Sequence, residues 1–436
     1  MAIDEYNVIA ALIYTSALFL VIFLLQRYPH CADLPQGTMG WPLLGETIGF
    51  LKPHLPNSLG SYLEEKCSKY GKVFKSRLFG CSTIVSCNHE LNLFVLQNEE
   101  KLFCGSYPKA MHGILGKLSV LTTSGELHKK LRSHVVRFTS MCRSSPEFLQ
   151  CIEKISLSML VSWKDQVQVL FHEEARKFMF TLTLKQVLSI EPEEPRALNI
   201  LQDFMTFMHG FLSIPLNVPG TAYAKAVKAR KRILSKLKEI IRERRSKELG
   251  RGDFFDMMLD AENLTDEEAM SLVMDILLAG YETTSTLLSA IVYVLGQEPC
   301  ILQQLKAEHQ AIRESKDKGE PLNCEDYKNM RFTSNVISEA LRWGNMVKFV
   351  HREAIQDVKF NGYVIPAGWK VLPIFTAAHL DPSLHHDPSH FDPSRWHDSM
   401  TNKKVSPFGG GARLCPGSEL AKEEVACFLH HLVLSY

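Results

Sequence analysis

One cysteine in a glycine-rich loop near the end of the chain carries the strongest chemical signal of the sequence. Cys415 follows Gly409–Gly411 and Arg413, and it stands directly before Pro416 and a helical run. Proline suits the first position of a helix, so we expect the sulfur near the positive end of a helix dipole, where a thiolate is favoured. The glycines allow a flat group to approach, and Arg413 offers it a cation. A single thiolate in such a loop is what haem iron needs as an axial ligand.

A buried structural cysteine is the common alternative for a lone thiol, whereas a zinc site is disfavoured because no Cys-x-x-Cys or paired His spacing accompanies it. The loop resembles, position for position, the Phe-x-x-Gly-x-Arg-x-Cys-x-Gly haem loop of the cytochrome P450 superfamily. Phe408, Gly411, Arg413, Cys415 and Gly417 fill its fixed places. The resemblance implies that Cys415 ligates the iron of haem b (iron protoporphyrin IX), with Phe408 and Arg413 beside it.

A second signal lies in a long predicted helix. A capping box at Thr265–Glu268 opens it, and it ends near Gln297, before Pro299. A helix of some thirty mostly apolar residues would cross a whole domain interior. Its middle nevertheless carries Gly280 and a Glu-Thr-Thr run, which suit a buried helix poorly. Such a local break is where a functional site is expected.

Four residues of this break could do chemistry. Ala279 and Gly280 could let a flat ligand approach the backbone. Thr283 can donate a hydrogen bond to the carbonyl of the preceding turn, and its hydroxyl group can hold a small polar ligand. Glu282 could supply protons through water. A kink with satisfied hydroxyl groups is the alternative on spacing alone. The stretch resembles the Ala-Gly-x-Glu-Thr-Thr oxygen-activation segment of cytochromes P450. It also precedes the cysteine loop, as it does in that family.

A charged framework accompanies these two segments. Glu339 and Arg342 stand at i and i+3 of one predicted helix, a spacing that is often only a surface pair. The pair resembles the Glu-x-x-Arg pair of the family, and Arg395 resembles the arginine that completes its ion-pair triad. The resemblance implies a structural role for all three residues.

Haem propionates need cations. The family commonly has tryptophan where this chain has His128, followed by an arginine that corresponds to Arg132. Arg352 aligns with another propionate partner, and an ordinary salt bridge is its alternative. The resemblance therefore implies that His128, Arg132 and Arg352 bind the propionates.

Length and composition limit the classes of protein to which the chain can belong. The chain has 436 residues, of which 45% are hydrophobic, and it can bury a large core. The net charge of +1 argues against a dedicated nucleic-acid binder. Eleven irregularly spaced cysteines favour reduced thiols facing the cytosol over a disulfide framework.

An uncharged stretch near the start predicts a membrane anchor. Val8–Leu25 contains no charged residue and would form a helix roughly 27 Å long, enough to cross a bilayer core. Asp4 and Glu5 stand where a signal peptide would be basic, so we expect an uncleaved anchor with the bulk of the protein in the cytoplasm. We therefore predict a single-pass protein of the endoplasmic reticulum, with an anchor (1–30), a Pro/Gly-rich hinge (31–55) and a haem-binding catalytic domain (56–436).

The fold class expected is mainly α with a small β portion, and the resemblance implies the cytochrome P450 fold. The sequence predicts two short strands, at Lys72–Ser76 and Ser82–Ser86. It also predicts a hairpin of the same sheet at Tyr363–Leu372. The basic stretch Lys225–Lys247 has an amphipathic helical period. A solvated helix face is the simplest account of its charge, and contact with anionic membrane lipid is an addition to it.

Several stretches resemble the plant steroid-hydroxylase branch that makes brassinosteroids, most closely the side-chain hydroxylases acting near C-22 of campesterol-type sterols. These stretches are Leu34–Thr47, Leu341–Arg352 and Cys415–Val425. The resemblance implies a rigid apolar sterol substrate. The candidates for its pocket are apolar residues: Phe207, Phe211, Met274, Leu278, Ala279, Val347 and Phe349.

The resemblance further implies monooxygenation with O2 as co-substrate and electrons from NADPH through a cytochrome P450 reductase, in a monomer. Five lysines are candidates for a basic face that docks an acidic reductase: Lys129, Lys130, Lys403, Lys404 and Lys422. The chain ends at Tyr436, 21 residues after Cys415, where the family normally adds a small β element. Two alternatives stay open: a haem- or sterol-binding protein without turnover, and an oxidase of a gibberellin-pathway diterpenoid acid.

Overall fold

The structure, a computed structural model, describes residues 10–11, 13–19, 33–42, 44–211, 213, 215–246, 251–317 and 319–436. The described residues of the predicted anchor, 10–11 and 13–19, are helical and exposed, and the rest of the anchor lies outside the described residues. Among the described residues, one helix has the length and hydropathy to cross a membrane. This is α12 (Asp266–Gln297), and half of its most apolar stretch is buried inside the protein.

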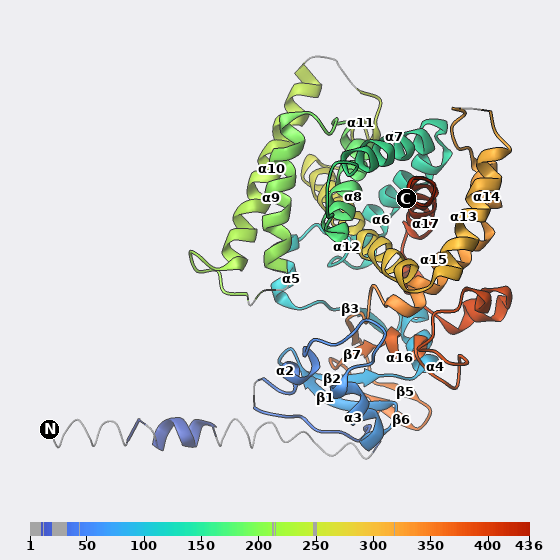
Figure 1. Cartoon of the computed structure of the whole chain (residues 1–436). Helices are drawn as coiled ribbons and strands as arrows, with labels where there is room; N and C mark the ends of the chain where they lie inside the picture. Colours follow the sequence, from blue (N-terminus) through green and yellow to red (C-terminus); the bar gives the residue numbers. More distant parts are fainter. Residues whose placement is uncertain are drawn as a thin grey trace.

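The helices form one large lobe, and the strands lie in a smaller lobe below it (Figure 1). The helix α12 runs through the large lobe, and α9 and α10 pair along one side of it. The other helices of the large lobe surround α12: α5 (Lys109–Leu115), α6 (Gly125–Ser144), α7 (Pro146–Ser162), α8 (Phe171–Leu188), α9 (Pro195–Phe211), α10 (Ala222–Ser246), α11 (Phe254–Leu259), α13 (Pro299–Glu314), α14 (Cys324–Asn329), α15 (Arg331–Gly344) and α17 (Ser418–Ser435).

The smaller lobe holds a five-stranded mixed sheet in the order β1-β2-β7-β4-β3 and a two-stranded sheet of β5 and β6. The strands are β1 (Val73–Leu78), β2 (Cys81–Ser86), β3 (Phe103–Gly105), β4 (Arg352–Ala354), β5 (Val358–Phe360), β6 (Tyr363–Ile365) and β7 (Lys370–Pro373). Four helices belong to this lobe: α2 (Thr47–Phe50), α3 (Ser61–Tyr70), α4 (His89–Gln97) and α16 (Phe375–His379).

The two strands predicted first are confirmed as the antiparallel pair β1–β2. The predicted hairpin Tyr363–Leu372 is wrong. Its first half, β6, pairs with β5 in the small sheet, whereas its second half, β7, lies between β2 and β4 in the large one. Pro366 and Gly368 allow the chain to turn between the two sheets, and the strand pattern alone does not tell which neighbour each half takes.

The long predicted helix is confirmed, and its start follows from the capping box. Thr265 Oγ1 accepts a hydrogen bond from the backbone of Glu268, and the Glu268 carboxylate accepts one from the backbone of Thr265. The apolar residues of α12, such as Leu277 and Leu288, are fully buried in the main core. The predicted basic helix is also confirmed as α10, whose apolar stripe faces α9 and the core.

A buried histidine pair joins α13 to α17 beneath this core. Thr333 donates its hydroxyl proton to Glu308 (2.5 Å), so it accepts a hydrogen bond from His309 Nε2 (3.0 Å). His309 Nδ1 then accepts a hydrogen bond from His430 Nδ1 (3.1 Å), which makes the His309 ring neutral. Burial lowers the pKa of His309 to about 4 and that of His430 to about 3.

This pair predicts a loss of stability in acid. Because the pKa of the folded histidine lies below its ordinary value of 6.5, the unfolded chain binds more protons as the pH falls. The stabilisation is complete above 6.5 and is lost toward the folded pKa of about 4; for His309 the loss is about 2 kcal/mol near pH 5. Thermal unfolding across this range measures the loss. H430N keeps a donor at the Nδ1 position without a titrating group, so its stability should depend less steeply on pH; an unchanged slope would contradict the assignment.

Candidate active site

The cysteine loop is a tight turn that leads into α17. The backbone N–H of Cys415 donates to the carbonyl of Phe408 (3.0 Å), and the N–H of Gly409 donates to the carbonyl of Ser406 (3.0 Å). The helix begins at Ser418 with Gly417 as its N-cap, so the prediction that Pro416 occupies the first helical position is wrong by two residues. The Gly417 N–H donates to the sulfur.

The electrostatics of Cys415 differ in part from the sequence prediction. Burial raises the pKa of the Cys415 thiol, which is opposed by the Gly417 N–H and by the positive charge of Arg132. The predicted helix-start donor is therefore present, Arg132 adds a cation that the sequence did not reveal, and burial outweighs both effects. Arg132 reaches the loop from α6, where its guanidinium donates to the carbonyl of Leu414 (2.5 Å).

Gly409 and Gly411 of the loop both adopt left-handed backbone conformations, but only Gly411 also lies in close contact with α4. At Gly411 (φ +63°) a Cβ would lie 1.9 Å from the backbone oxygen of Leu96 in α4, whereas at Gly409 (φ +74°) a Cβ would meet nothing within 4 Å. The close approach of α4 therefore accounts for glycine at 411, and backbone conformation alone accounts for glycine at 409.

We expect G411A to disturb the cysteine loop more than G409A. Both variants strain the backbone by roughly 1–2 kcal/mol, but only G411A also forces α4 and the loop apart. The fraction of protein with the far red-shifted Soret band of the ferrous carbon monoxide complex measures the effect. Equal fractions in the two variants would show that the contact with Leu96 has no influence.

The middle of α12 is continuous with the rest of the helix and carries both exposed and buried residues. Ala279 and Thr283 are exposed one turn apart in a helix that is otherwise largely buried, and Thr283 Oγ1 donates to the carbonyl of Ala279 (2.7 Å). The back-bonding predicted for Thr283 is therefore present. Gly280 does not share this face: a Cβ there would lie 2.8 Å from Thr183 Oγ1 in α8. The glycine permits close packing of α12 against α8, and the approach of a flat ligand to Gly280 stays a prediction.

The acidic residue of this segment has a partner that the sequence did not reveal. Arg176 of α8 donates to both carboxylate oxygens of Glu282, at 2.7 and 3.0 Å, and it also contacts Glu173 at 3.2 Å. Glu282 retains 41% side-chain exposure. The ion pair therefore orients the carboxylate and leaves it accessible to water. No local pattern links Arg176 to Glu282, since 106 residues separate them.

Arg413 of the cysteine loop and the predicted propionate ligand Arg352 meet one buried carboxylate. Glu99, directly after α4, lies 2.6 Å from Arg413 Nε and 2.5 Å from Arg352 Nε, and its side chain is 2% exposed. Arg413 also donates to the carbonyls of Leu121 (3.3 Å) and Thr123 (2.6 Å). Glu99 was missed by the sequence analysis, because a lone glutamate in a polar loop carries no signal. It holds both arginines, of which Arg413 also contacts the loop before α6.

The remaining two predicted propionate ligands, His128 and Arg132, form no ion pair with a described residue. His128 is buried, and burial together with the charges of Arg413 and Arg132 lowers its pKa to about 4. Among the described residues, no carboxylate lies within 4.0 Å of the Arg132 guanidinium, and desolvation lowers its pKa. His128 and Arg132, both on α6, therefore offer donors and a positive charge that the protein itself does not neutralise.

The predicted ion-pair triad is present. Arg342 and Glu339 are completely buried and form two hydrogen bonds, of 2.6 and 2.9 Å. Arg395 Nε lies 3.4 Å from Glu339, and Trp396 Nε1 also donates to Glu339 (3.0 Å). These contacts tie α15 to the segment that precedes the cysteine loop.

A histidine that the sequence analysis missed joins this framework to the cysteine loop. His379 is fully buried; its Nε2 accepts from the N–H of Ser406 (3.0 Å), and its Nδ1 lies 2.8 Å from Asn345 Oδ1. The amide of Asn345 donates to Pro56 O (3.1 Å), so its oxygen faces the histidine and accepts from Nδ1. Only the neutral ring protonated at Nδ1 satisfies both bonds. Arg342 completes the link by donating to the His379 carbonyl (2.8 Å).

The two bonds of His379 can be separated by substitution. Asparagine places an amide near Nδ1 and glutamine places one near Nε2, so H379N loses the Ser406 bond and H379Q loses the Asn345 bond. We expect H379N to destabilise the loop by about 1–3 kcal/mol and to lower the fraction with the thiolate-type carbon monoxide spectrum. H379Q should retain that fraction. A reversed order would contradict the role of the Ser406 bond.

The predicted sterol-pocket residues are not gathered in one place. Phe207, Met274 and Leu278 are buried in the main core, and Phe211 is partly buried against it. Val347 and Phe349 lie in the segment between α15 and β4. With Ala279 on the exposed face of α12, the structure brings together only part of this set.

Three of the five lysines predicted for a docking face are paired within the chain. Lys129 binds Glu126, Lys130 binds Glu268 and Lys422 binds Glu419, each at 2.7–2.9 Å. Lys403 and Lys404 make no ion pair with any described residue. The free positive charge of the predicted face is therefore smaller than the sequence indicated.

Comparison with known proteins identifies this arrangement of a cysteine loop, a long buried helix and a buried ion-pair triad. A family model described as Cytochrome P450 matches residues 35–436. The chain belongs to the cytochrome P450 family. The recognition of a cytochrome P450 monooxygenase from the cysteine loop is thereby confirmed.

Similar cytochromes P450 come from plants. Cytochrome P450 724B1 of Oryza sativa subsp. japonica is 54% identical over 98% of this chain and 92% of its own length. Cholesterol 22-monohydroxylase CYP90B52 of Paris polyphylla is 45% identical over 96% of this chain and 91% of its own length. Steroid (22S)-hydroxylase of Oryza sativa subsp. japonica is 42% identical over 93% of this chain and 83% of its own length. The solved structure of retinoic acid-bound cyanobacterial CYP120A1 matches with a TM-score of 0.81 at 28% identity over 92% of both chains. The predicted P450 fold is therefore confirmed.

Proposed function

We propose that this cytochrome P450 hydroxylates the side chain of a plant sterol at C-22, with campesterol-type brassinosteroid precursors as substrates. The observation that carries the proposal is the identity of 42–45% to proteins named cholesterol 22-monohydroxylase and steroid (22S)-hydroxylase, over at least 93% of this chain. The family membership supports haem-thiolate monooxygenation as the reaction type.

The residues present fit a haem. Cys415 offers a sulfur at the start of α17, and metal coordination deprotonates a thiol outright, which overcomes the effect of burial. Arg132 and His128 offer unneutralised donors to the propionates, while Arg413 and Arg352 stay fixed by Glu99. When bound, haem supplies the oxygen-activating chemistry that no side chain can perform.

The protein's own share is positioning and proton supply. Arg176 holds the carboxylate of Glu282 in one orientation, and the exposure of Glu282 allows water to carry protons to it. Thr283 offers a hydroxyl group on the neighbouring exposed face of α12, beside Ala279. We assign Glu282 and Thr283 to proton delivery at the oxygen-binding face, and Glu339, Arg342 and Arg395 to the structural core.

The partners follow from the reaction. A NADPH-dependent cytochrome P450 reductase supplies the electrons, and Lys403 and Lys404 are the predicted docking lysines that remain free of ion pairs with described residues. An N-terminal anchor in the membrane of the endoplasmic reticulum would hold the catalytic domain at the cytoplasmic surface, where an apolar sterol is delivered from the lipid.

Incubation of the full chain with reductase, NADPH and campesterol tests the proposal. A product hydroxylated at C-22, identified by mass spectrometry and absent with C415A, supports it. A substrate-induced shift of the Soret band without any product would instead support a sterol-binding protein without turnover. Turnover of a gibberellin-pathway diterpenoid acid, with none of campesterol, would replace the substrate class.

A further inference from the structure

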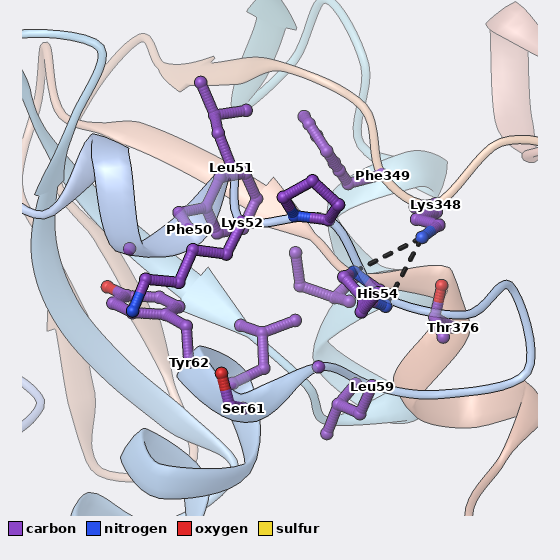
Figure 2. A pocket seen from close by; sticks show the side chains of 15 residues that line it. Phe50, Leu51, Lys52, His54, Leu59, Ser61, Tyr62, Lys348, Phe349 and Thr376 are labelled. Atoms are coloured by element: carbon purple, nitrogen blue, oxygen red, sulfur yellow. Dashed lines mark hydrogen bonds between the residues drawn. The ribbon is translucent and has the colours of Figure 1, made fainter.

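A hollow lies in the smaller lobe, and Figure 2 shows the side chains that line it. Its volume is about 240 Å³, and its lining comes from residues 49–54 and 59–63, from Lys348 and Phe349, and from Ile374 and Thr376. None of these lining residues belongs to α12, to α6 or to the cysteine loop. Phe349 is also one of the residues predicted for the sterol pocket, and the other lining residues belong to no site described above.

Apolar side chains form most of its walls. The rings of Phe50 and Phe349 meet edge to face with centroids 5.1 Å apart, and Phe349 pairs with Ile374 through a β-bridge. Leu51 lines the hollow and is 57% exposed, and Leu55, just outside the lining, is 70% exposed. The apolar surface thus continues from the hollow to the exterior of the protein.

Polar donors converge at one end of this apolar space. His54 Nδ1 lies 3.1 Å from the carbonyl of Leu55, so it carries the ring proton, and Nε2 accepts from the ammonium of Lys348 (3.2 Å). The other two N–H groups of Lys348 have no acceptor among the described residues. Thr376 Oγ1 is buried without a hydrogen-bond partner, and its chain neighbour Phe375 is bonded to the carbonyl of Lys348 (2.8 Å).

The charge at this end is not balanced by the protein. Among the described residues, no carboxylate lies within 4.0 Å of Lys348 Nζ, and burial lowers the pKa of Lys348. A hydroxyl group in the hollow would satisfy hydrogen bonds but leave the cation without a counter-ion. A carboxylate would satisfy the free donors and also neutralise the charge.

We propose that this hollow binds the carboxylate end of a long-chain fatty acid, with Lys348 and Thr376 donating to the carboxylate and Phe50, Phe349 and Ile374 contacting the chain. Its volume lies below the roughly 300–1,000 Å³ typical of sites for drug-sized ligands, so it holds the head group and the first part of a flexible chain. The rest of the chain leaves over Leu51. The site goes beyond sterol hydroxylation and does not depend on it.

Calorimetric titration of the haem-loaded full chain with palmitate tests the site. K348Q should weaken palmitate binding about 10- to 100-fold, because a charge-assisted bond is lost, and T376V about 3- to 10-fold. K348R keeps the charge and should restore binding to within about threefold of the wild type. Lys359 of β5 is exposed and outside the hollow, so K359Q is the matched control and should bind palmitate as the wild type does.

Two further measurements separate this site from the haem site and from unspecific adsorption. The uncharged analogue 1-hexadecanol should bind more weakly than palmitate and should not respond to K348Q. Palmitate should leave the campesterol-induced Soret shift intact. The proposal is overturned if K348Q binds palmitate as the wild type does, or if palmitate displaces campesterol. Loss of C-22 hydroxylation with retained palmitate binding would instead refute only the sterol assignment.

Discussion

Replacing Arg342 by methionine is expected to destabilise the protein by about 3–5 kcal/mol and to prevent stable retention of haem. Arg342 and Glu339 are both 0% exposed, so removal of the cation leaves a carboxylate in the core with its main partner gone. The arginine also donates to the carbonyls of His379 and Pro388, both at 2.8 Å. Denaturant unfolding and the ratio of haem to protein measure both losses.

A surface pair with the same spacing is the matched control. Lys328 and Glu325 also stand at i and i+3, but their side chains are 69% and 72% exposed. K328M should therefore change the free energy of unfolding by less than about 1 kcal/mol. A cost of R342M as small as that of K328M would show that the buried pair does not hold the core.

Replacing Glu282 by glutamine should lower kcat about 100-fold or more, with little change in haem content or in the carbon monoxide spectrum. Glutamine keeps the shape and can still accept a hydrogen bond from Arg176, but it cannot exchange a proton with water. A larger solvent deuterium isotope effect on kcat in E282Q than in the wild type is expected, since proton delivery would then limit the rate.

Glu173 provides the control for this variant. It contacts the same Arg176 at 3.2 Å but belongs to α8 instead of α12. E173Q should therefore keep kcat within about threefold of the wild type. If E173Q and E282Q slow turnover equally, the effect comes from the environment of Arg176, and Glu282 does not deliver protons.

Local patterns determined much of this protein. The capping box at Thr265 set the start of α12, and the amphipathic period of Lys225–Lys247 set α10, because hydrogen bonds and side-chain periodicity within a helix are local. The spacing around Cys415 identified the haem loop for the same reason. The loop needs glycines, an arginine and a cysteine at fixed short distances along the chain.

Only the tertiary structure decided which distant groups meet. Glu99 binds Arg413 and Arg352 across more than 250 residues, Arg176 binds Glu282 across 106, and His379 reaches Ser406 from another helix. A single glutamate, arginine or histidine has no periodicity to reveal its partner. The same limit applies at Gly280, since the sequence did not reveal that α8 packs closely against this glycine. Packing of the whole chain brings these residues together, and packing is not encoded at any one position.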